Sequence, residues 1–183
     1  MKKLKGVIVF TAIIFLFSLA YFIAVYKTYA GSEEKETVFT EIGEGLRTLG
    51  LGALLVIYGR TVLKLSLGKG PVAQRILPEI IDDKSQSILK DLLNLLNKTH
   101  LHVGIVAVAL TALHAVFMGL SGRNLLLWMV LALLAWQTLF GFFLSWRYSP
   151  KSLRKVSYFV HAQFLTGITI GIFSLFGHLL AGD

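Results

Sequence analysis

Residues 100–114 read HLHVGIVAVALTALH, and this stretch decides the fold of the chain. It is apolar except for its histidines and one threonine, so it predicts a helix inside a membrane. Three of the five histidines of the chain, His100, His102 and His114, lie in it, and the other two, His161 and His178, lie in one later apolar segment. Because ionisable side chains are costly in hydrocarbon, histidines confined to apolar segments indicate a functional site.

The composition places the whole chain in the membrane class. Of its 183 residues 55% are hydrophobic and only 15% are charged, and the mean hydropathy is +0.71. The chain has no cysteine, which excludes disulfides, iron–sulfur clusters, thiolate zinc sites and covalently attached c-type haem. The net charge of +8 is explained by basic cytoplasmic loops, and no soluble segment is large enough for a nucleic-acid-binding fold. Nucleic acid is therefore excluded as a partner.

Apolar segments predict five transmembrane helices, at about residues 6–26, 46–67, 101–120, 125–146 and 156–180. Each is close to the ~20 residues that cross a bilayer. The first is longer than the ~7–15-residue core of a signal peptide, so we expect a retained helix. Residues 85–97 place leucines at helical spacing among polar residues, which predicts an amphipathic helix at the cytoplasmic interface or, alternatively, a docking surface for a partner subunit. The predicted fold is a single all-α integral membrane domain over residues 1–183.

Basic residues predict how the helices are oriented in the bilayer. Lysines precede the first helix, and further basic residues gather in the loop 68–99 and in residues 147–155. Glutamates dominate residues 31–44, and the turn at residues 121–124 is short. Since basic loops stay in the cytoplasm, we expect an inner (cell) membrane protein with a cytoplasmic N-terminus and an external C-terminus.

The orientation pairs the histidines at two levels. The third and fifth predicted helices both run from inside to outside, so like ends lie together. His161 is then level with His100 or His102, and His114 is level with His178. His100 and His114 are about 21 Å apart along the axis and within about 40° of one face.

The spacing on the fifth predicted helix is less regular. His161 and His178 would be about 25 Å apart and about 100° away from a shared face. A straight helix cannot present both to one neighbour. Helix tilt, a local distortion near Gly167 or Gly171, or haems at different angles around this helix would reconcile the two positions.

Imidazoles on two helices of one bundle indicate haem, whose iron takes two axial ligands on opposite faces. We expect two b-type haems, with His100, His114, His161 and His178 as iron ligands and His102 as an alternative to His100. Basic residues close to the predicted haems are candidates for binding the propionates, namely Arg60, Arg154 and Arg123.

The four histidines resemble those of the ferric-reductase-type transmembrane domain, over roughly residues 46–180. The longer spacing on the last helix is similar to that of the cytochrome b subunit of respiratory nitrate reductase. The resemblance implies two b-type haems and electron transfer across the membrane. We expect these electrons to pass between a quinone pool and a partner redox protein. Since the sequence stops at Asp183 without a flavin or nicotinamide domain, we expect an electron-transfer subunit of a membrane oxidoreductase. The alternatives are a histidine-lined metal or proton transporter and a cofactor-free membrane anchor subunit.

Overall fold

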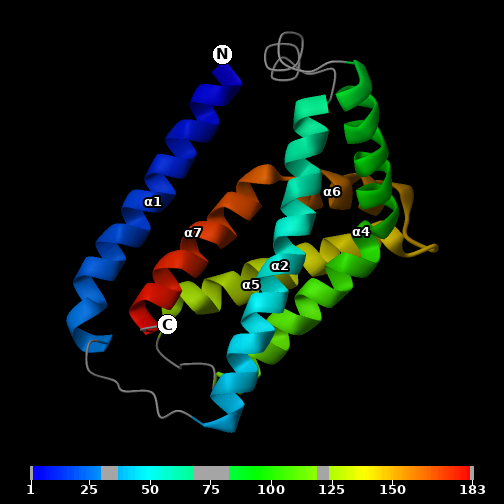
Figure 1. Ribbon diagram of the computed structural model, residues 1–183. Coiled ribbons are helices and arrows are strands. Elements are labelled where there is room, and N and C mark those ends of the chain that lie inside the picture. The colour runs from blue at the N-terminus through cyan, green and yellow to red at the C-terminus, as the bar shows by residue number, and fades with distance from the viewer. Residues whose placement is uncertain (1, 30–36, 68–82, 119–123, 182–183) are drawn as a thin grey trace. The chain divides into compact units, whose positions relative to one another are not determined.

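The computed structural model describes residues 2–29, 37–67, 83–118 and 124–181, in which all regular structure is helical (Figure 1). Five of the helices are long and apolar enough to cross a membrane, which confirms the predicted all-α class and helix count. The helices are α1 (Lys2–Tyr29), α2 (Val38–Leu67), α4 (Asp83–Phe117), α5 (Leu125–Ser145), α6 (Lys151–His161) and α7 (Phe164–Ala181).

The chain divides into two compact units. Helices α2 and α4 form one unit, and α1, α5, α6 and α7 form the other. The histidines are divided in the same way, with three on α4 and one each on α6 and α7.

Helix α2 begins about two turns before its apolar segment. Thr37 and Thr40 cap it reciprocally, because the Thr37 amide donates to Thr40 Oγ1 (2.8 Å) and the Thr40 amide donates to Thr37 Oγ1 (3.3 Å). Glu41 lies in the first turn, where a carboxylate interacts favourably with the helix dipole. The polar start of α2 is therefore stabilised by caps rather than by apolar burial, which the hydropathy pattern does not reveal.

Helices α2 and α4 pack as an antiparallel pair. Gly50 is buried against α4, where a Cβ atom would lie 3.6 Å from both Leu110 Cβ and Thr111 Oγ1. Towards the other end, Arg60 Nε donates to Asn97 Oδ1 at 2.8 Å. In lipid, small residues at a helix interface let the backbones approach closely, so this glycine favours the pairing.

Residues 85–97 do not form a helix of their own. They are the N-terminal part of α4, which continues without a break from Asp83 to Phe117. There is no proline in this helix, and the first glycine after its start is Gly104, so nothing ends the helix between the amphipathic and apolar parts. The 35 residues of α4 extend about 52 Å, well beyond the ~30 Å hydrocarbon core.

The fifth predicted helix is two helices. Helix α6 ends at His161, and α7 begins at Phe164 after a short turn. In this turn the Ala162 amide donates to Tyr158 O (3.0 Å) and the Gln163 amide donates to Val160 O (3.4 Å). The expected distortion therefore exists, but it follows His161 directly. The prediction that Gly167 or Gly171 distorts the helix is wrong, since both lie inside α7.

In the four-helix unit, Asn124 joins α5 to α7. Its side chain is fully buried, accepts a hydrogen bond from the Leu127 amide (3.4 Å) as the N-cap of α5, and donates to Gly177 O (2.7 Å). A Cβ atom on Gly177 would lie 2.6 Å from Leu127 Cδ2, so the two helices touch closely here. Helix α1 packs on the same end of α7 through Phe176, whose ring lies 5.3 Å from that of Phe15 and 5.9 Å from that of Phe22.

Candidate functional site

All five histidines lie on helices, but their environments differ. His102 is exposed, whereas His100, His114, His161 and His178 are half-buried. The Nδ1 atoms of His100 and His178 are shielded from solvent. Each predicted pair takes one histidine from each unit, so the pairing stays a prediction.

His114 is fixed by a backbone carbonyl of α2. Its Nδ1 atom lies 2.8 Å from Gly43 O. A carbonyl oxygen can only accept, so Nδ1 donates the proton in this contact, and in the neutral ring the lone pair is then on Nε2. Gly43 is buried, and a Cβ atom there would lie 2.7 Å from Met118 Sδ and 3.5 Å from Phe117 Cβ. The absence of a side chain at residue 43 therefore lets the end of α4 approach this carbonyl.

His161 has an equivalent contact with α5. Its Nδ1 atom lies 2.9 Å from Gln137 O, so Nδ1 again donates the proton in this contact. One turn further along α5, a Cβ atom on Gly141 would lie 3.0 Å from His161 Cε1 and 3.3 Å from Nδ1. The imidazole thus lies against the backbone of α5 in the space that Gly141 leaves.

His178 directly follows Gly177, the residue through which α7 contacts the start of α5. The carbonyl of Gly177 accepts from Asn124, and its Cα approaches Leu127, so the backbone next to His178 is fixed on α5. His161 is fixed near the opposite end of the same helix, at Gln137 and Gly141.

Helix α5 therefore gives a measure of the distance between the two histidine positions in this unit. The residues at the start of α5 that contact Gly177 (Asn124 and Leu127) and those that contact His161 (Gln137 and Gly141) are separated by 10 to 17 residues, or about 15 to 26 Å of helix rise. His100 and His114 on α4 are about 21 Å apart by the same measure. The spacing of His100 and His114 therefore falls within the range measured along α5.

The contacts of His114 and His161 are those that metal-ligating histidines use. Such a histidine donates its second ring N–H to a carbonyl or carboxylate, which fixes the tautomer and the ring orientation and makes the ligating nitrogen more basic. Among the residues that the structure describes, no three or more histidine, aspartate or glutamate side chains gather as a metal site. A haem with two axial histidines needs only two protein ligands, and these imidazoles are of the required kind.

The predicted propionate-binding arginines fall into three situations. Arg60 is held by Asn97, which lies one turn before His100 on α4, so its guanidinium is placed near that histidine. Arg154 is exposed on α6 and its Nη2 donates to Trp146 O (3.2 Å), which closes the loop between α5 and α6. Arg123 lies outside the described residues.

Sequence reasoning missed the groups that position the imidazoles. The sequence does not predict the roles of Gly43 and Gly141, because a backbone acceptor or a close approach has no residue-type signature. Gln137 is a candidate partner of an axial histidine through its side-chain amide, whereas the structure uses its backbone carbonyl. The available signal was a glycine inside an apolar helix, which costs helix stability unless something packs closely against it.

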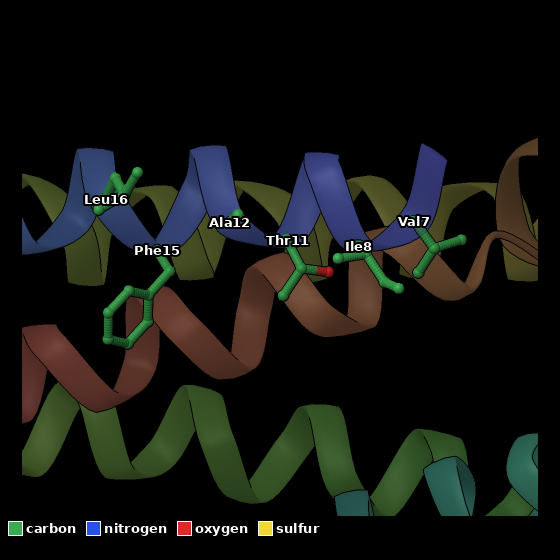
Figure 2. Close-up of a pocket in the computed structure, with 6 residues that line it drawn as sticks. All are labelled: Val7, Ile8, Thr11, Ala12, Phe15 and Leu16. Carbon is green, nitrogen blue, oxygen red and sulfur yellow. The ribbon is translucent and has the colours of Figure 1, made fainter. Parts of the chain in front are cut away.

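The structure also has an apolar hollow along α1, of about 500 Å³ (Figure 2). Figure 2 shows Phe15 directed towards α7. None of the six lining side chains is ionisable, so the hollow is separate from the histidine site. They are Val7, Ile8, Thr11, Ala12, Phe15 and Leu16.

No protein-family model matches this chain, and no curated protein or solved structure matches it either. The resemblance to ferric-reductase-type domains therefore depends on the histidines alone.

Proposed function

We propose that this chain is a dihaem b-type membrane cytochrome that transfers electrons across the membrane. In this proposal His114 pairs with His178, and His161 pairs with His100, as axial ligands of two haems. The observation that carries it is the pair of contacts from His114 Nδ1 and His161 Nδ1 to backbone carbonyls. Each proposed haem would then have one ligand whose tautomer and orientation are fixed by the fold.

The spacing of the histidines supports the same proposal. Contact positions about 15 to 26 Å apart along α5 in one unit are compatible with histidines about 21 Å apart on α4 in the other, as two haem levels require. When bound, each haem supplies a one-electron ferric–ferrous couple, and two such groups in series would connect the membrane faces. His100 is preferred to His102 as a ligand, because its Nδ1 is buried whereas the His102 side chain is exposed.

The surrounding residues have supporting roles in this proposal. Arg60 would bind a propionate of the cytoplasmic haem, with Asn97 holding its guanidinium in place. Arg154 and Arg123 are the further propionate candidates. We propose the lipid bilayer, a quinone and a redox partner subunit as partners, in an inner membrane with the N-terminus in the cytoplasm.

The main alternative is that the histidines only join helices by hydrogen bonds, as polar residues in membrane proteins often do. The two explanations differ in one observable. Structural histidines give a colourless protein, whereas two axial imidazoles give a low-spin haem spectrum. Absorption spectroscopy therefore separates them directly.

The experiment is to purify the full chain from cells supplied with haem and to record oxidised and dithionite-reduced spectra. Haem per chain is then measured in the wild type and in the His114→Ala, His161→Ala and His102→Ala variants. We expect both haems in the wild type, loss of one haem in each of the first two variants, and retention of both in His102→Ala. A colourless wild-type protein, or equal haem content in all variants, would refute the proposal.

A further inference from the structure

We propose that α6 forms a binding surface for the headgroups of anionic phospholipids. This inference does not depend on haem. It rests on where α6 lies relative to α5, on which side chains its faces expose, and on the charge of the unit to which it belongs.

Helix α6 slopes from the end of α5 towards its middle. At its N-terminal half, Arg154 donates to Trp146 O, at the C-cap of α5. At its C-terminal end, His161 contacts Gln137, which lies about two turns back from the end of α5. Since α5 and α7 are both long and apolar enough to cross a membrane, the connection between them begins at a membrane boundary and enters the apolar region.

The side chains of α6 divide into three faces. Ser157 is fully buried, and Leu153 and Val160 beside it are half-buried, so this face packs on the protein. Val156 and Phe159 expose 53% and 71% of their surface on a second face. The third face is basic and carries Lys151, Arg154 and Lys155, all exposed. An apolar face beside a basic face is typical of a helix at the boundary between acyl chains and headgroups.

The basic charges of α6 have no carboxylate counterpart among the described residues of this unit. Its described residues, 2–29 and 124–181, contain no aspartate or glutamate. Lys151 and Arg154 also lie in the first turn of α6, at the positive end of the helix dipole, where cations are unfavourable. An external anion at this end of α6 would offset both the clustered charges and the dipole.

A lipid surface fits α6 better than an acidic protein does. The basic face is continuous with exposed aromatic side chains: Trp146 is 42% exposed, Tyr148 75% and Tyr158 59%. Tryptophan and tyrosine are enriched at membrane interfaces, where their rings reach the headgroup level. Basic residues at this level attract anionic lipids, whereas a soluble acidic partner would leave the apolar face of α6 unexplained.

The test uses Trp146 as a probe of the lipids that surround α6. The variant Trp128→Phe/Trp136→Phe keeps Trp146 as the single tryptophan, and the variant Trp136→Phe/Trp146→Phe keeps Trp128, near the opposite end of α5. Each is placed in nanodiscs of phosphatidylcholine that contain a fixed fraction of either brominated phosphatidylglycerol or brominated phosphatidylcholine. Bromine quenches tryptophan fluorescence only at close range, so the ratio of the two signals reports local enrichment.

We expect brominated phosphatidylglycerol to quench Trp146 more strongly than brominated phosphatidylcholine, with a local enrichment of up to about fivefold per basic residue engaged. Quenching of Trp128 should be the same with both lipids. The change Lys151→Gln/Lys155→Gln should remove the difference at Trp146, whereas Lys27→Gln on α1 should leave it intact.

Two results would overturn the inference. One is equal quenching of Trp146 by both lipids. The other is a phosphatidylglycerol preference that persists in Lys151→Gln/Lys155→Gln, which would show that these lysines do not bind headgroups. Both lysines are exposed, so their replacement should leave the thermal midpoint close to that of the wild type.

Discussion

Replacing Gly141 by alanine tests whether this position holds the imidazole of His161. The added Cβ would lie 3.0 Å from His161 Cε1 and 3.3 Å from Nδ1, where ordinary contacts begin at 3.4 Å. The ring must therefore retreat by about 0.4 Å, since the methyl group is fixed to the backbone of α5. Such a movement lengthens the 2.9 Å contact with Gln137 O to about 3.3 Å, at the long end of the hydrogen-bond range, so the hydrogen bond is weakened or lost.

The effect on overall stability should be small, because two terms oppose each other. Alanine inside a helix is favoured over glycine by about 1 kcal/mol. Loss of the imidazole–carbonyl hydrogen bond costs about 0.5–1.5 kcal/mol. We therefore expect the free energy of unfolding to change by less than about 1 kcal/mol, while the orientation of the His161 ring changes measurably.

The assay combines thermal unfolding in detergent with haem per chain and the low-spin electron paramagnetic resonance signals. If His161 ligates haem as proposed, Gly141→Ala should lose or alter one haem and keep the other. Gly52→Ala is the matched control, since a Cβ on this exposed α2 residue meets nothing within 4 Å among the described residues. Gly141→Ala protein with both haems and unchanged signals would refute the reasoning, as would equal haem loss in Gly52→Ala.

Three further predictions concern packing, each checked by the thermal midpoint of the purified protein. Asn124→Ala should destabilise the fold by about 2 kcal/mol, because it removes the N-cap of α5 and the bond to Gly177 O, and an unchanged midpoint would contradict this. Gly43→Ala should lower the midpoint, because its Cβ would lie 2.7 Å from Met118 Sδ. Adding Met118→Ala to the same chain should restore part of this loss. If the midpoint does not recover, the strain lies elsewhere. Phe176→Ala should cost about 1–3 kcal/mol through its two ring contacts with α1, and a loss below about 0.5 kcal/mol would show that these rings contribute little.

The sequence by itself determined the all-α class of the chain and the number of helices long enough to cross a membrane. Apolar runs of about 20 residues predict membrane-length helices, because hydrophobicity is a local property and the lipid requires the backbone to bond within each segment. The same local reasoning located all five histidines on helices. It failed at helix boundaries, where Thr37 caps α2 early, where α4 continues through residues 85–97, and where the turn after His161 separates α6 from α7.

Only the tertiary structure decided how the imidazoles are held. His114 bonds to a carbonyl 71 residues away and His161 to one 24 residues away, and no residue type marks a backbone acceptor. The separation of His161 on α6 and His178 on α7 was decided in the same way. It follows from the contacts that these helices make with Gln137 and Asn124 at α5, rather than from counting residues along one helix. Hydropathy depends on each segment alone, whereas tautomer and ring orientation depend on the neighbour that the fold places beside each ring.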